Sequence, residues 1–195
     1  MLRSVDRASS ASRFAAAIGL VGVLCAGSVW AADVTPSPIS FPGKLKAAKS
    51  PSGRYDVRIK RLADDHGAPT YRLTLQDLKQ HRRQNIVTFQ RSVELTWRSG
   101  AEGFSLNEYT ASNFSDCVVA VPGERMKFRS LMERIAKQPD LGIAETVNNS
   151  HFYVECRGWN GADQVAVAVF GHKGEDGSGF SYDLKYDLAR DTFQK

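Results

Sequence analysis

Apolar and polar residues alternate over much of the chain that follows residue 53. Tyr55, Val57 and Ile59 are separated by charged residues, so this segment has one apolar and one charged face. A period of two predicts a β-strand that buries one side. The same alternation recurs in three further segments, which are 71–75, 87–97 and 180–188. Arg91 is the charged residue that interrupts the apolar positions of the second of these.

Two other segments are apolar on both faces. Residues 117–122 read CVVAVP, and residues 164–170 read QVAVAVF. Short continuous apolar runs are typical of strands that are covered on both sides. We therefore expect these two segments to be central strands.

One part of the chain has helical spacing instead. Phe128, Leu131, Met132 and Ile135 stand at positions i, i+3, i+4 and i+7. This spacing predicts a helix with one apolar side. Pro139 is expected to end the helix, because proline cannot continue the hydrogen-bond ladder.

The order of the elements predicts the fold class. Strands come first, a second short helix is expected in residues 141–147, and strands follow again. The expected class is α+β and mostly β. It is an antiparallel twisted sheet or meander, with one or two helices inserted between Cys117 and Cys156.

The N-terminal segment has the three parts of a secretory signal peptide. Three arginines precede an apolar run at residues 14–24, and small residues follow. This arrangement predicts cleavage after Ala31. The alternative is an uncleaved anchor, because the apolar character just reaches the roughly 20 residues that span a bilayer. The expected organisation is a signal peptide at 1–31, a proline-rich linker or extended lead-in at 32–53, and a single β-rich domain at 54–195.

The charge balance bears on the class of partner. The full chain carries +5, and loss of the three arginines and one aspartate in residues 1–31 leaves +3. Charges of both signs are interspersed, a balance that does not indicate nucleic-acid binding. The basic stretch at 79–85 is interpreted as a solvated surface. No transmembrane segment is expected in the mature chain.

The cysteine count favours a disulfide. The chain has three cysteines, and Cys117 and Cys156 remain once Cys25 is removed with the leader. An exported chain meets an oxidising compartment, so the remaining pair is predicted to be bridged. Chain entropy gives about 4 kcal/mol of stabilisation for a loop of this length. The alternative is two free thiols, or one reactive thiol.

The polar stretch between residues 103 and 123 has two interpretations. Asn, Ser and Asp side chains hydrogen-bond their own backbone, so the stretch can be a structural turn. It can also be a ligand loop that a rigid scaffold presents. The candidate ligand residues are Asn107, Glu108, Tyr109, Asn113 and Asp116. The turn is favoured, because turn chemistry accounts for every residue type.

A catalytic interpretation of the same stretch has less support. Cys117 or a neighbouring serine could be a nucleophile only with a base within hydrogen-bond reach, and His151 is the candidate base. No G-x-S-x-G motif surrounds the serines. If residues 151–157 are extended, His151 and Cys156 face opposite sides of the sheet. No catalytic residue is therefore predicted.

Two histidines are expected to share one face of a hairpin. The chain should reverse near Asn160 and Gly161, which places His151 either directly opposite His172 or diagonal to it. Two imidazoles so placed are weak candidates for metal binding. Half-exposed histidines at strand ends are the favoured interpretation, because no third ligand is evident. Neither a metal centre nor a cofactor is expected.

These features together predict an exported protein, periplasmic or secreted, with a small β-rich domain. A non-enzymatic binding or interaction protein of the cell envelope is the favoured role, with an envelope protein or a glycan as partner. A hydrolase that uses Cys117 or a neighbouring serine with His151 is the alternative.

Overall fold

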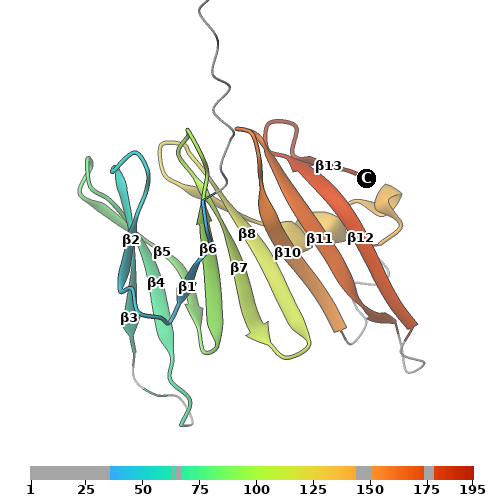
Figure 1. The fold of residues 1–195 in the computed structure, drawn as a ribbon, viewed down its shortest axis with the longest axis horizontal. Helices are drawn as coiled ribbons and strands as arrows, with labels where there is room; N and C mark the ends of the chain where they lie inside the picture. The colour runs from blue at the N-terminus through green and yellow to red at the C-terminus, as the bar shows by residue number, and fades with distance from the viewer. Residues whose placement is uncertain (1–35, 63, 65–66, 144–150, 174–177) are drawn as a thin grey trace, which may run out of the picture. The chain divides into compact units, whose positions relative to one another are not determined.

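Two β-sheets make up most of the described protein (Figure 1). The computed structural model describes residues 36–62, 64, 67–143, 151–173 and 178–195. The predicted signal peptide, residues 1–31, lies outside the described residues. Within the described ranges, no helix has the length and apolar character needed to cross a membrane.

The larger sheet has nine strands in the described part of the chain. Its main path is β1 (Ile39–Phe41), β6 (Ser92–Trp97), β7 (Phe104–Ala111), β8 (Phe114–Val121), β10 (His151–Asn160), β11 (Gln164–Lys173), β12 (Ser178–Asp187) and β13 (Thr192–Gln194). β9 (Lys127–Ser130) lies off this path and pairs with β8. Neighbouring strands are antiparallel except for β8 and β10, which are parallel. The mostly β, antiparallel fold class is therefore confirmed.

The smaller sheet has four strands, β2 (Ala47–Lys49), β3 (Tyr55–Arg61), β4 (Tyr71–Asp77) and β5 (Arg82–Phe89). In β3, Tyr55 and Val57 are buried on the face that the alternation predicted. Asp56 departs from the pattern, because it belongs to the charged face but is only 1 % exposed. Its Oδ2 accepts a hydrogen bond from Nε of Arg58 at 2.7 Å, which compensates part of the cost of burying the charge.

Part of the proline-rich segment belongs to the sheets. β1 and β2 both lie within residues 32–53, and they pair with β6 and β3 respectively. Residues 87–97 are divided between two strands, because β5 ends at Phe89 and β6 begins at Ser92. The chain passes from the smaller to the larger sheet at this point. Arg91 lies at the crossing and is exposed, which explains the charged residue among the apolar positions.

The helix is shorter than its spacing predicted. α1 covers Leu131–Ala136, whereas the preceding four residues form β9. β10 pairs with only the first two residues of β8, and β9 supplies hydrogen-bond partners along the same edge from Val118 to Val121. This pairing overrides the helical spacing at Phe128, which packs against the core beside the smaller sheet.

Local capping fixes where α1 begins. The hydroxyl of Ser130 accepts a hydrogen bond from the backbone N–H of Glu133 at 3.1 Å, as an N-cap residue does. Pro139 lies beyond the helix and begins a 3-10 turn, η1 (Pro139–Leu141). The second predicted helix, 141–147, shares only Leu141 with this turn, and residues 144–147 lie outside the described part.

Strand β8 lies between two hydrophobic cores, because its side chains alternate between two faces. Cys117 and Val119 belong to a core with α1 and strands β10 to β13. Val118 and Ala120 belong to a second core with β6, β7 and the smaller sheet. The apolar character of this strand on both faces therefore has a structural cause.

Cys117 and Cys156 form the predicted disulfide, and their Cα atoms are 5.7 Å apart. Both cysteines are buried. β8 and β10 pair through two residues of each strand, Phe114 with Phe152 and Ser115 with Tyr153. The disulfide therefore holds β10 to β8 beyond the point where their backbone pairing ends. α1 lies in the sequence between the two cysteines, as predicted.

Candidate functional site

The five candidate ligand residues lie on a tight hairpin. Asn107, Glu108 and Tyr109 are in β7, Asp116 is in β8, and Asn113 is in the turn between them. Glu108 and Asp116 are register partners and therefore share one face of the sheet, while Asn107 and Tyr109 lie on the other. The structure thus separates these five side chains. Their part in ligand binding stays a prediction.

Asn107 has a structural partner. Its Nδ2 donates to the carbonyl oxygen of Cys156 at 3.1 Å, and its Oδ1 accepts from the N–H of Cys156 at 2.8 Å. These are the two hydrogen bonds that a neighbouring strand would make with Cys156. The side chain of Asn107 therefore takes the place of a strand where β10 has left β8.

Glu108 and Tyr109 also have partners within the sheet. The Tyr109 hydroxyl donates to Oε2 of Glu94 at 3.1 Å, and burial raises the pKa of Tyr109, which keeps the hydroxyl protonated. Oε1 of Glu108 accepts from Thr110 Oγ1 at 3.2 Å, and burial raises the pKa of Glu108. Glu108 is therefore bound within its own strand, and Tyr109 is bound to the neighbouring strand β6.

Asp116 connects β8 to the start of α1. Its Oδ2 accepts a hydrogen bond from Ser130 Oγ at 2.6 Å, and its Oδ1 accepts from the N–H of Met132 at 3.1 Å. Burial outweighs these hydrogen bonds and raises the pKa of Asp116 from 3.8 to about 6. In the folded protein the carboxyl group therefore holds its proton under mildly acidic conditions.

Replacing Asp116 with Asn is expected to remove a pH dependence of stability. Between pH 3.8 and about 6 the folded state keeps a proton that the unfolded state has lost, so stability falls as the pH rises through this window. The loss should be on the order of 2 kcal/mol in the wild type. Asp116→Asn cannot ionise, and its urea-unfolding free energy should fall less over the same window. Parallel curves for the two proteins would contradict this assignment.

The proposed nucleophile and base do not meet. Cys117 is buried and bonded to Cys156, so it offers no thiolate. His151 is exposed on the other face of β10, as the odd separation from Cys156 predicted. Ser115 is fully buried, and within the described residues its hydroxyl has no hydrogen-bond partner. No hydrogen bond between His151 and a serine hydroxyl is present in the described chain, so no observation favours the hydrolase alternative.

The two histidines do meet. His151 is the direct register partner of His172, and their ring centroids are 5.9 Å apart. The register shifts between Cys156 and Gly158, where β10 carries an irregularity, and three residues connect β10 to β11. These two features select the direct pairing from the two arrangements that the sequence allowed.

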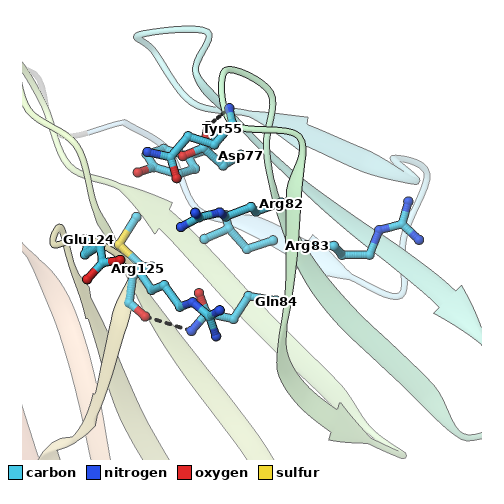
Figure 2. A pocket seen from close by; sticks show the side chains of 10 residues that line it. Tyr55, Asp77, Arg82, Arg83, Gln84, Glu124 and Arg125 are labelled. Atoms are coloured by element: carbon cyan, nitrogen blue, oxygen red, sulfur yellow. Dashed lines mark hydrogen bonds between the residues drawn. The ribbon is translucent and has the colours of Figure 1, made fainter.

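A cavity that was not predicted lies between the smaller sheet and the connection from β8 to β9 (Figure 2). It has a volume of about 210 Å³. Tyr55, Leu75 and Met126 are buried and provide its apolar surface. The side chain of Gln84 spans one side of the cavity, and its Nε2 donates a hydrogen bond to the carbonyl oxygen of Met126 at 2.8 Å. The cavity therefore lies beside the hydrogen bond that links β5 to the connection between β8 and β9.

Two arginines extend into this cavity. Figure 2 shows Arg82 and Arg125 directed into the space between β5 and the β8–β9 connection, whereas the side chain of Arg83, a residue that also borders the cavity, is directed away from it. The direction of Arg83 follows from strand alternation, because Arg82 and Gln84 share the inner face of β5. Within the described residues, neither Arg82 nor Arg125 has a carboxylate partner. Both side chains are exposed, and Glu124 lines the same cavity without a salt bridge to either of them in the described part of the chain.

Other charges at the cavity are partly neutralised. Arg54 forms two ion pairs. Its Nη2 lies 3.0 Å from Oδ2 of Asp77, and its Nη1 lies 2.9 Å from Oε2 of Glu102. Burial raises the pKa of Tyr55, and the negative charge of Glu102 adds to this effect. The Tyr55 hydroxyl therefore stays a neutral donor, and no hydrogen bond to it is present among the described residues. The cavity combines two arginines that form no ion pair within the described residues, hydrogen-bond donors and apolar surface, a combination that suits an organic anion.

The sequence contained part of this signal. The basic stretch at 79–85 includes Arg82 and Arg83, but it was interpreted as a solvated surface. Alternation along β5 could have directed Arg82 inward with Gln84. Arg125 could not be placed beside them, because the packing of the two sheets brings it there.

Comparison of the chain with protein-family models, with curated proteins and with solved structures gave no match.

Proposed function

We propose that the protein is an exported, non-enzymatic binding protein of the cell envelope, and that its cavity holds an acidic sugar unit of an envelope glycan. The observation that carries the proposal is the pair Arg82 and Arg125, which line a cavity with an apolar surface and have no carboxylate partner in the described residues. Export is supported by the leader-like sequence at 1–31 and by the disulfide.

The chemistry of the cavity matches the parts of an acidic sugar. A carboxylate or phosphate group would accept charge-assisted hydrogen bonds from the two guanidinium groups. The less polar face of the sugar ring would pack on Met126 and Tyr55. Glu124 and the amide oxygen of Gln84 would accept hydrogen bonds from sugar hydroxyls. These acceptors favour a hydroxylated anion over a purely apolar one.

Arg82→Gln is expected to weaken binding of glucuronate by about tenfold or more, because it removes a charge-assisted hydrogen bond. Calorimetric titration of the full mature chain with glucuronate, and with glucose as the neutral analogue, measures this effect. Glucose should bind much more weakly than glucuronate.

Arg83→Gln is the matched control, since it removes the same charge from the same strand, and its side chain points away from the cavity that the residue borders. It should bind glucuronate as the wild type does. Equal losses in both variants would show that only the overall charge matters, and would overturn the assignment of the cavity. Binding of an acidic peptide without binding of glucuronate would identify a protein partner instead.

A further inference from the structure

We propose that His151 and His172 bind a divalent transition-metal ion, such as Cu²⁺ or Zn²⁺, on the outer face of β10 and β11. This site is separate from the cavity and does not depend on the proposed function. Three observations carry the inference: the distance between the rings, the hydrogen bond that fixes the tautomer of His151, and a shallow depression that His172 helps to line.

The distance between the two rings suits a shared metal ion. Two imidazole nitrogens that bind one ion at about 2.0–2.1 Å with a near-tetrahedral angle place their ring centroids about 5–6 Å apart. The observed centroids are 5.9 Å apart, and the ring planes are inclined by 81°. The backbone register sets this spacing, because His151 and His172 are directly opposite each other. The two strands therefore hold the backbones of the two histidines opposite each other before any ion binds.

Tyr153 determines which nitrogen of His151 is free. The hydroxyl of Tyr153 donates its one proton to the carbonyl oxygen of Ser112 at 2.8 Å. Its oxygen also lies 3.2 Å from Nδ1 of His151, and it must act there as the acceptor. Neutral His151 consequently carries its proton on Nδ1, and the lone pair is on Nε2. Metal-binding histidines commonly donate their second ring nitrogen to an oxygen in this way.

There is room at the site for further ligands. Gly179 is the register partner of His172 on β12, and a Cβ atom there would lie 4.0 Å from Nδ1 of His172. A shallow depression of about 450 Å³ is lined by His172, Tyr153 and Phe170, among other residues. The described residues provide no group of three acidic, histidine or cysteine side chains, so water would complete the coordination.

The nitrogen ligands of an imidazole pair determine which metal ions it binds. Neutral nitrogen ligands favour Cu²⁺, Ni²⁺ and Zn²⁺ over Mg²⁺ and Ca²⁺, and divalent copper is bound most strongly in this series. We therefore expect one Cu²⁺ per chain, with Zn²⁺ competing for the same site and Mg²⁺ without effect.

Titration of the full mature chain with Cu²⁺, followed by electron paramagnetic resonance, tests the inference. One bound ion should show nitrogen hyperfine structure from two imidazoles. His151→Ala and His172→Ala should each lower the affinity by at least about tenfold and leave at most one imidazole in the spectrum. Tyr153→Phe removes the acceptor for Nδ1 and should lower the affinity by about tenfold with both imidazoles still bound, as loss of an outer hydrogen bond does.

His81→Asn is the control, because His81 is exposed and lies on another part of the chain. It should bind Cu²⁺ as the wild type does. Unchanged affinity in His151→Ala or in His172→Ala would overturn the proposal, as would a wild-type spectrum with a single imidazole. These outcomes are independent of glucuronate binding, so failure here leaves the proposed function untouched.

Discussion

Replacing Cys117 and Cys156 together with Ala is expected to lower the free energy of unfolding by about 4 kcal/mol. The disulfide closes a loop with a sequence separation of 39 residues, so its loss gives the unfolded chain considerable freedom. It also removes a bond between β8 and β10 where no backbone pairing between these strands is described. The double variant is preferable to a single one, because a lone buried thiol could form mixed disulfides.

Urea unfolding of the oxidised wild type, the reduced wild type and the double variant measures this effect. The intact mass of each sample establishes whether two hydrogens are missing. The reduced protein and the double variant should both unfold at lower urea than the oxidised protein. Equal midpoints for all three would show that the disulfide contributes nothing to stability.

Asn107→Ala is expected to cost about 3 kcal/mol of stability, because it leaves a backbone N–H and a backbone C=O without partners near the core. The N–H and the C=O both belong to Cys156, which is 8 % exposed. Asn107→Asp keeps an acceptor for the N–H of Cys156. It replaces the donor to the C=O of Cys156 with a carboxylate oxygen, which repels that carbonyl oxygen. It should therefore also destabilise the protein.

Thermal unfolding monitored by circular dichroism compares these variants with Asn85→Ala. Asn85 is an exposed residue of β5, and its replacement should change stability by less than about 0.5 kcal/mol. If Asn107→Ala melted together with Asn85→Ala, Asn107 would not act in place of a strand. It would then again be a candidate for ligand binding.

Patterns that depend on near neighbours were predicted correctly. The alternation at Tyr55 and Val57, the disulfide and the shared face of His151 and His172 all follow from the chain's own period or from simple pairing rules. The alternation and the histidine pairing need only one strand or one hairpin, and the disulfide follows from the number of cysteines left in an exported chain. No knowledge of how the sheets pack is required.

Features that depend on packing could not be predicted. The spacing at Phe128 is helical, but residues 127–130 form a strand, because they pair with the edge of β8 that β10 leaves unpaired. Asp116 reads as a turn residue, yet it lies in β8 and accepts hydrogen bonds at the start of α1. Arg125 is far from Arg82 in the sequence, and they meet only because two sheets pack together.

The position of the cavity has a mechanical consequence. Arg82 belongs to β5 in the smaller sheet, whereas Arg125 belongs to the connection that leaves β8 in the larger one. An anion bound by both side chains would link the two sheets, beside the hydrogen bond that Gln84 already donates to Met126. A bound anion would therefore stabilise the packing of the two sheets. The backbone amides of β3 to β5 would then exchange with deuterium more slowly when the anion is bound than when it is absent.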